Sequence, residues 1–139
     1  MPALNKLVSI SQGGLLWPPS ICRYLRGKQL LEENYGKIDR EKMISFSTDH
    51  KNGPESNSIC RHDKNQKESP TVSAAIMEID RQYPEKSKIS FALGSPCWAW
   101  NHDDGNFTYQ MDEDPKRVPK QFFDDTVFKK YIQPEPYQI

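Results

Sequence analysis

The chain has 139 residues and carries 19 basic and 19 acidic side chains, so its formal net charge at pH 7 is zero. A neutral chain of this length holds at most one ordinary domain, and it lacks the basic surface that nucleic acids and anionic membranes attract. Hydrophobic residues make up only 35% of the sequence, which predicts a modest core and favours a part of a larger fold over a self-sufficient domain.

The cysteine count and the lengths of the apolar runs bear on the cellular location of the protein. Three widely spaced cysteines cannot form a complete disulfide framework, and they fit a reducing environment. No apolar run approaches the roughly 20 residues of a membrane-spanning helix. Residues 1–20 lack the charged and then apolar order of a signal peptide. The sequence therefore favours a cytoplasmic location and no membrane partner, without identifying the compartment.

Two helices are predicted in the first third of the chain. Residues 1–20 form a poorly specified segment broken by Gly-Gly and Pro-Pro pairs. The spacing of apolar residues predicts a helix over 20–35, with Ser20 as its cap and Gly36 as its stop. A second, shorter helix is expected over 38–44, where Asp39 is the candidate cap.

The second half of the chain predicts an antiparallel hairpin. Residues 71–80 read as a strand that is apolar on both faces, and residues 88–93 as an alternating strand, with a turn at 83–87. A short third strand is expected over 107–111 and a last short helix over 122–131, before an extended tail at 133–139. A strand covered on both faces belongs in a layered α+β fold.

The polar stretch 45–62 separates the helices from the hairpin. It holds two of the three histidines and one of the three cysteines, and it reads as a shaped loop that carries reactive groups. Asn57 and Ser58 hold its turn in the simplest interpretation. The candidate substrate-binding residues are Asp49, His50, Asn57, Ser58, Arg61 and His62.

Each charged or titratable residue among the substrate-binding candidates has two interpretations. Asp49, with His50 beside it, could orient a substrate amine or brace the loop through backbone N–H groups. Arg61 could bind a substrate carboxylate in a bidentate manner or pair with Asp49 or Glu55. His62 could carry a proton or make a fixed hydrogen bond at the entry to the strand.

The remaining cysteines and aromatic residues leave further alternatives. Cys60 and Cys97 could be small packed side chains or the two halves of a disulfide. Cys60-x-His62 and Cys97-x4-His102 could together supply four zinc ligands, although the first spacing is tighter than usual. Trp98 and Trp100 alternate, so they could point the same way and either line a pocket or cover the sheet edge.

The order of the motifs resembles a known family. A helix ending in Leu-Leu-Glu-Glu-Asn-Tyr-Gly-Lys-Ile-Asp39 is followed by Asp49-His50, by Asn57-Ser-Ile-Cys-Arg-His62, by the hairpin and by Leu93-Gly-Ser-Pro-Cys97. Over roughly residues 22–100 this resembles the C-terminal part of the isopenicillin-N acyltransferase-like family of Ntn hydrolases. It is similar also to the beta-alanyl-dopamine hydrolases.

The resemblance implies a fold and a chemistry. Residues 21–132 would form the C-terminal portion of a four-layer αββα sandwich, with a helix followed by an antiparallel hairpin. Family members cut themselves to free an N-terminal cysteine, whose thiolate attacks an amide or thioester carbonyl. The acyl group then passes to water or to an amine. The substrate would be an acyl-amine or an N-acyl amino acid, and neither a cofactor nor a metal site is implied.

The chain departs from the family pattern at the nucleophile. Cys22 lies inside a predicted helix, whereas Cys60 and Cys97 match motifs that follow the nucleophile in the family. We therefore expect a fragment or truncated member whose catalytic residues are unknown and whose activity is in question. Its partner would be a complementary N-terminal chain or a second copy. The alternatives are a non-catalytic scaffold of the same fold and a small zinc-binding module.

Overall fold

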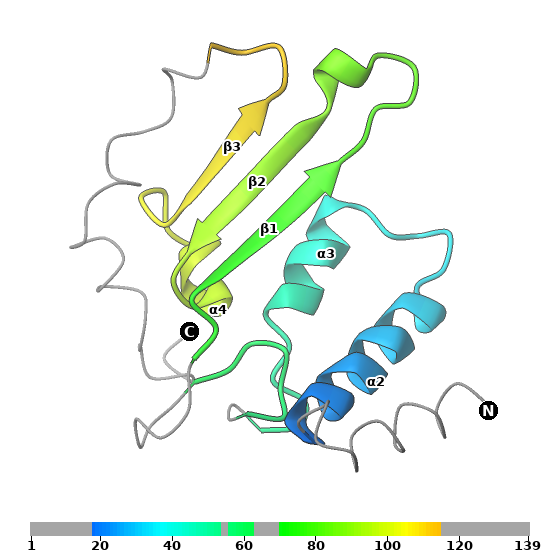
Figure 1. The fold of residues 1–139 in the computed structure, drawn as a ribbon, viewed down its shortest axis with the longest axis vertical. Helices are drawn as coiled ribbons and strands as arrows, with labels where there is room; N and C mark the ends of the chain where they lie inside the picture. Colours follow the sequence, from blue (N-terminus) through cyan, green and yellow to red (C-terminus); the bar gives the residue numbers. More distant parts are fainter. Residues whose placement is uncertain (1–17, 54–55, 63–69, 115–139) are drawn as a thin grey trace.

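The computed structural model describes residues 18–53, 56–62 and 70–114 of the chain. Within these ranges the fold is a small α+β arrangement in which helices precede a three-stranded antiparallel sheet, as Figure 1 shows. The predicted helix at 122–131, most of the N-terminal segment 1–20 and the tail 133–139 lie outside the described residues. None of the described helices has the length and hydropathy of a membrane span.

Both predicted helices are confirmed. Helix α2 runs over Pro18–Glu33 and helix α3 over Arg40–Ser47. The candidate cap Asp39 accepts the backbone N–H of Lys42 at 2.8 Å, and Gly36 adopts the expected positive φ of 74° in the turn after α2.

The predicted limits of the helices needed correction. Ser20 does not cap α2, because the helix already begins at Pro18, where a missing N–H costs nothing. Helix α3 continues to Ser47 rather than ending at residue 44. The hydroxyls of Ser47 and Thr48 donate to carbonyl oxygens of its last turn, and Phe46 is buried.

The predicted hairpin and its third strand are also confirmed. Strand β1 spans Ser73–Glu78, β2 spans Lys88–Leu93 and β3 spans Asn106–Gln110, in the order β1-β2-β3. The turn between β1 and β2 contains a single 3₁₀ turn, η1, at Pro84–Lys86. The register places Ile76 opposite Ser90, and Ser90 opposite Thr108.

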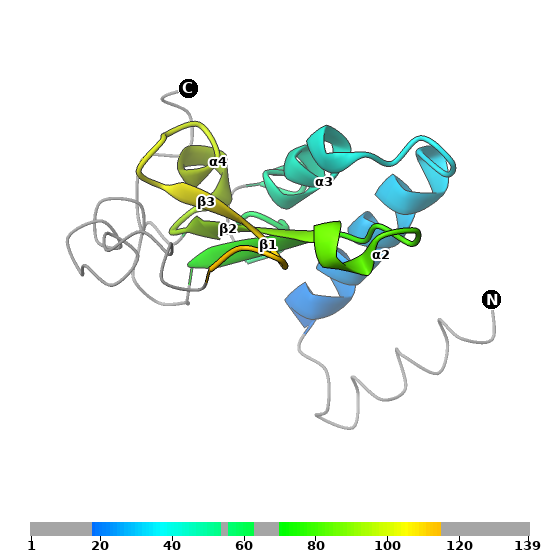
Figure 2. The same ribbon diagram turned by 90° about the horizontal axis from the view of Figure 1, so that it is seen from above.

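One face of the sheet is covered by helices. Helix α3 and the short helix α4, Pro96–Ala99, lie on the same side of the sheet in Figure 2. The residues that point to this side include Ile76, Ser90 and Ala92, all of which are buried. The small side chains of β2 allow the helices to approach the sheet closely.

The opposite face is apolar, and no described helix or strand covers it. We call it the open face. Met77 is 68% exposed and Phe91 is 38% exposed, so the described residues cover β1 on one face only, and its predicted cover on both faces stays a prediction. The open face consists of Ala75, Met77, Ile89, Phe91, Leu93, Phe107 and Tyr109.

The chain turns sharply after β2, as expected, but it then enters a helix. Gly94 takes a φ of 97°, and helix α4 follows at once. A helical turn sends residues two apart in different directions, so Trp98 and Trp100 do not share one face. Trp98 stacks on His102 at a centroid distance of 5.4 Å, whereas the indole N–H of Trp100 donates to Ser47 Oγ in α3 at 2.9 Å.

Candidate functional site

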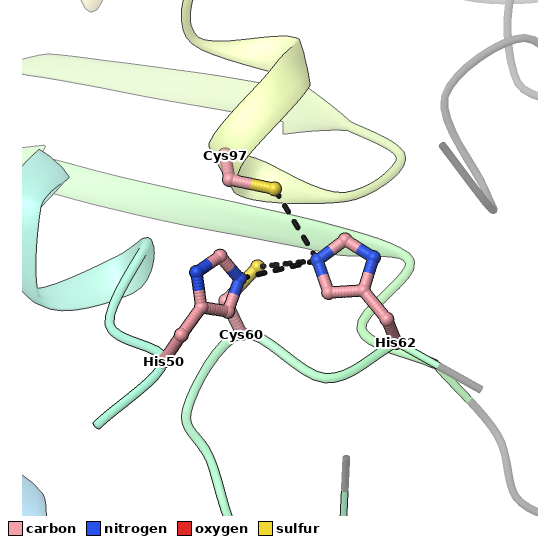
Figure 3. A group of neighbouring side chains, drawn as sticks. All are labelled: His50, Cys60, His62 and Cys97. Carbon is pink, nitrogen blue, oxygen red and sulfur yellow. Dashed lines mark hydrogen bonds between the residues drawn. The ribbon is translucent and has the colours of Figure 1, made fainter. Parts of the chain in front are cut away.

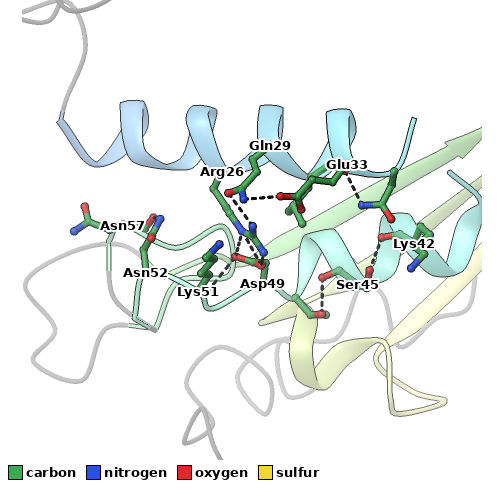
Figure 4. Close-up of polar contacts among 12 residues, drawn as sticks. Arg26, Gln29, Glu33, Lys42, Ser45, Asp49, Lys51, Asn52 and Asn57 are labelled. Carbon is green, nitrogen blue, oxygen red and sulfur yellow. Dashed lines mark hydrogen bonds and ion pairs between the residues drawn. The ribbon is translucent and has the colours of Figure 1, made fainter. Parts of the chain in front are cut away.

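The polar loop after α3 is fastened to α2 by an ion pair. The guanidinium of Arg26 donates from Nη2 and Nε to Asp49 Oδ2 at 2.6 and 3.0 Å (Figure 4). Burial acts to raise the pKa of Asp49, but the hydrogen bonds from Arg26 and from the backbone N–H of Lys51 outweigh it and hold that pKa below its usual value. Asp49 therefore braces the loop.

The ion pair between Arg26 and Asp49 removes one of the two candidate partners of Arg61. The carboxylate of Asp49 is engaged by Arg26, so it does not form the ion pair that was considered for Arg61. The other candidate partner, Glu55, lies outside the described residues. The backbone N–H of Arg61 donates to Thr71 Oγ1 at 3.0 Å.

The two predicted turn residues differ in their surroundings. Ser58 is fully buried, and its hydroxyl donates to the carbonyl oxygen of Cys60 at 2.6 Å. Asn57 is exposed, and its carbonyl oxygen accepts from the Asn52 side chain. Asn57 borders an open cavity of about 500 Å³ between α2 and the loop, whose lining residues are Cys22, Leu25, Arg26, Gln29, Lys51, Asn52 and Asn57.

Thr71 fixes the backbone of residues 59–61, which bends at Ile59 and Cys60. The Thr71 hydroxyl donates to the carbonyl oxygen of Ile59 at 3.0 Å, and the Thr71 backbone N–H donates to that of Arg61 at 3.0 Å. Cys60 and His62 direct their side chains toward one point, where Cys60 Sγ lies 3.6 Å from His62 Nε2.

At that point two histidines and two cysteines meet. His62 Nε2 lies 3.1 Å from His50 Nε2, 3.6 Å from Cys60 Sγ and 3.3 Å from Cys97 Sγ (Figure 3). The four ligand atoms all lie within 4.8 Å of one another. We call His50, Cys60, His62 and Cys97 the His/Cys cluster.

Three separate segments supply the cluster. His50 follows α3, and the carbonyl of the preceding Asp49 accepts the backbone N–H of Cys60 at 3.1 Å, which aligns the two parts of the loop. Cys60 and His62 come from the segment before β1. Cys97 belongs to α4, which the chain reaches only after the hairpin.

Helix α4 is pressed against the start of β3. The side-chain amide of Asn106 donates to the carbonyl oxygens of Ala99 and His102 at 3.0 and 2.9 Å. Gly105 approaches the same turn so closely that an added Cβ would lie 2.8 Å from the Ala99 carbonyl oxygen. These contacts fix the position from which Cys97 reaches the cluster.

The cluster is shielded from solvent, and its two thiols influence each other. Cys60, Cys97 and His62 are 0%, 2% and 4% exposed, and His50 is half-buried. The hydrogen bond with Cys97, followed by burial, raises the pKa of Cys60 to about 11. The same hydrogen bond from Cys60 lowers the pKa of Cys97. In the absence of a ligand the thiol proton therefore stays on Cys60, which is a poor nucleophile.

Three of the four residues considered as zinc ligands in the alternative interpretation lie together, and the fourth lies elsewhere. Cys60, His62 and Cys97 come together, but the fourth position is taken by His50 rather than His102. His102 Nδ1 lies 2.8 Å from the Trp98 carbonyl oxygen and its ring stacks on Trp98. Spacing along the chain favoured His102, whereas the pairing of Asp49 with Cys60 brings His50 to the site.

Comparison of the chain with protein-family models, with curated proteins and with solved structures finds no match.

Proposed function

We propose that this chain forms one helix-and-sheet layer of a cysteine Ntn-hydrolase-like protein that cleaves amides or transfers acyl groups. In this proposal the open face packs against a second sheet, and another polypeptide segment supplies the nucleophile. The substrate class is an acyl-amine or an N-acyl amino acid. The observation that carries the proposal is the open face itself.

The open face has the composition of an interior rather than of a surface. Its large side chains include Met77, Ile89, Phe91, Phe107 and Tyr109, and they lie on all three strands. Contiguous apolar patches of this kind mark interaction surfaces in soluble proteins. In an αββα sandwich, the face of each sheet opposite its helices packs on the other sheet. The described helices cover one face only, which is compatible with one half of such a sandwich.

The positions of the cysteines fit a chain that does not supply its own nucleophile. Cys22 is in the first half of helix α2, and Cys60 and Cys97 are buried in the His/Cys cluster. An Ntn nucleophile needs a free α-amino group on the same residue as the attacking thiolate. None of these three positions provides that arrangement.

Size and turnover of the purified chain test the proposal together. We expect light scattering to show a self-associated species, and we expect no hydrolysis of a panel of N-acyl amino acids and beta-alanyl amines. Met77→Glu combined with Phe91→Glu should reduce the self-association. Leu31→Glu on α2, where the side chain is 47% exposed, is the matched control and should leave it unchanged.

Two results would contradict the proposal. A monodisperse wild-type monomer with cooperative unfolding would show that the open face needs no second sheet. Turnover that disappears on alkylation of Cys22, Cys60 or Cys97 would show that a nucleophile lies within this chain.

A non-catalytic scaffold of the same fold is the second candidate. The burial of Cys60 and Cys97 is as compatible with it as with the enzyme layer. The two candidates differ in one measurement, namely hydrolysis after mixing with a separate chain that begins with cysteine. Turnover only in the mixture supports the enzyme layer, whereas complex formation without turnover supports the scaffold.

A further inference from the structure

Hydrogen bonding does not account for the geometry of the His/Cys cluster. Three groups, His50 Nε2, Cys60 Sγ and Cys97 Sγ, approach the single atom His62 Nε2 within 3.1–3.6 Å. An imidazole nitrogen carries either one N–H or one lone pair in the ring plane. It can therefore satisfy one of these neighbours well, and the other two need a different explanation.

We propose that His50, Cys60, His62 and Cys97 bind one Zn²⁺ ion in a tetrahedral site. Typical zinc bond lengths with a tetrahedral angle separate two nitrogens by about 3.3 Å, a nitrogen and a sulfur by about 3.5 Å and two sulfurs by about 3.8 Å. The nitrogen–nitrogen distance of 3.1 Å and the nitrogen–sulfur distances of 3.3 and 3.6 Å lie close to these values. The remaining pairs of ligand atoms lie within 4.8 Å of one another, so side-chain movements of up to about 1 Å would close the set around an ion.

The chemistry of the four donors supports the same ion. Two imidazoles and two thiolates form one of the usual donor sets of structural zinc sites. Zinc binding displaces the thiol protons of Cys60 and Cys97 to solvent, and the two thiolates then balance the charge of the ion. A neutral complex suits a site whose members Cys60, Cys97 and His62 are almost fully buried.

Four protein ligands leave no open position for a substrate or a water molecule. The site is therefore structural, because catalytic zinc sites retain an exchangeable position. Its effect is to join three segments, namely the loop after α3, the segment before β1 and helix α4. This inference is independent of the acyl-transfer proposal, because the site would hold the layer together in an enzyme or in a scaffold.

Metal titration of the reduced full chain is the first test. Co²⁺ serves as the spectroscopic probe for Zn²⁺, and we expect one ion per chain with tetrahedral d–d bands and thiolate-to-cobalt charge-transfer bands. Cys97→Ser and His50→Ala should abolish these bands. Cys22→Ser and His102→Ala are the matched controls and should keep them. Bands that survive both Cys97→Ser and His50→Ala would overturn the proposal.

Alkylation of the wild-type chain provides a test that does not depend on the folding of variants. With Zn²⁺ bound, iodoacetamide should modify Cys22 alone, and removal of the ion by a chelator should open Cys60 and Cys97 to modification. Cys22 is the internal control in every sample. Labelling rates of Cys60 and Cys97 that are the same with and without Zn²⁺, whether slow or fast, would contradict the site. A Cys60–Cys97 disulfide that persists under reducing conditions would contradict it also.

Discussion

The two faces of the sheet differ in the size of their side chains and in what lies against them. The helix-covered face presents Ala74, Ile76, Ser90 and Ala92, and it supports the helix that carries Cys97. The open face presents Met77, Phe91 and Tyr109, and no described element lies on it. Small residues lie on the helix-covered face, and large apolar residues lie on the open face. This difference is the basis for the proposal that a second sheet packs on the open face.

Removal of the metal should give the largest effect on the covered side. At a free Zn²⁺ concentration 100 times the dissociation constant, binding to the folded state alone adds about 2.7 kcal/mol to the free energy of unfolding. Cys97→Ser should therefore lose about that amount when unfolding by urea is measured in zinc buffer. Cys22→Ser should retain it. Equal stability of Cys97→Ser and the wild-type protein in zinc and in chelator would contradict a stabilising ion.

Adjacent positions on β2 compare the two faces directly. Ala92 is fully buried against the helices, so Ala92→Leu should overpack the covered face and lower the free energy of unfolding by about 1–3 kcal/mol. Phe91 lies on the open face and is 38% exposed. Phe91→Leu should therefore change the free energy of unfolding by less than about 0.5 kcal/mol in the monomeric state. Urea unfolding of both variants at low protein concentration measures this difference. A larger loss for Phe91→Leu would indicate that the open face is already packed.

The ion pair between α2 and the loop should have an intermediate effect. Arg26→Gln leaves the Asp49 carboxylate without its cation, and both side chains are largely buried at 13% and 12% exposure. Because the pair retains some solvent contact, we expect a loss of about 1–2 kcal/mol rather than the larger cost of a fully buried pair. Thermal unfolding measures this loss. Lys28→Gln, which removes an exposed pair with Glu32, should have almost no effect and is the control.

A charge on the open face should have the smallest effect on folding but a visible effect on association. Met77 is 68% exposed, so Met77→Lys should alter the free energy of unfolding by less than about 0.5 kcal/mol and raise solubility. Solubility and sedimentation velocity, measured alongside the wild-type protein, check this. Unchanged association in Met77→Lys would place the contact surface elsewhere on the molecule.

Local patterns in the sequence were sufficient for the helices and the hairpin. The apolar spacing in α2 and the alternation in Lys88–Leu93 depend on neighbours in the chain, and both predictions are confirmed. The cap Asp39 was also visible, because its signal lies within one turn. The prediction for Trp98 and Trp100 was wrong, because Pro96 starts a helical turn where an extended segment was assumed.

The candidate site was only partly visible in the sequence. Cys60 and His62 could be considered together, because one residue separates them in the sequence. The choice between His50 and His102 could not be made from spacing, since it depends on a backbone hydrogen bond from Cys60 to Asp49 and on the stacking of His102 against Trp98. The engagement of Asp49 by Arg26 was missed for the same reason, because α2 meets the loop only in the folded chain.

In the proposed function, a second sheet completes this layer and brings the nucleophile. To test this, the native protein is purified with an antibody against this chain, and the N-terminal sequences of all its polypeptides are determined. A photoreactive phenylalanine analogue at Phe91 of a tagged copy, which keeps the open face apolar, maps what lies against that face. We expect a polypeptide or segment that begins with cysteine and cross-links to the open face. Native protein made of this chain alone, with no cross-link from the analogue at Phe91, would contradict the proposal.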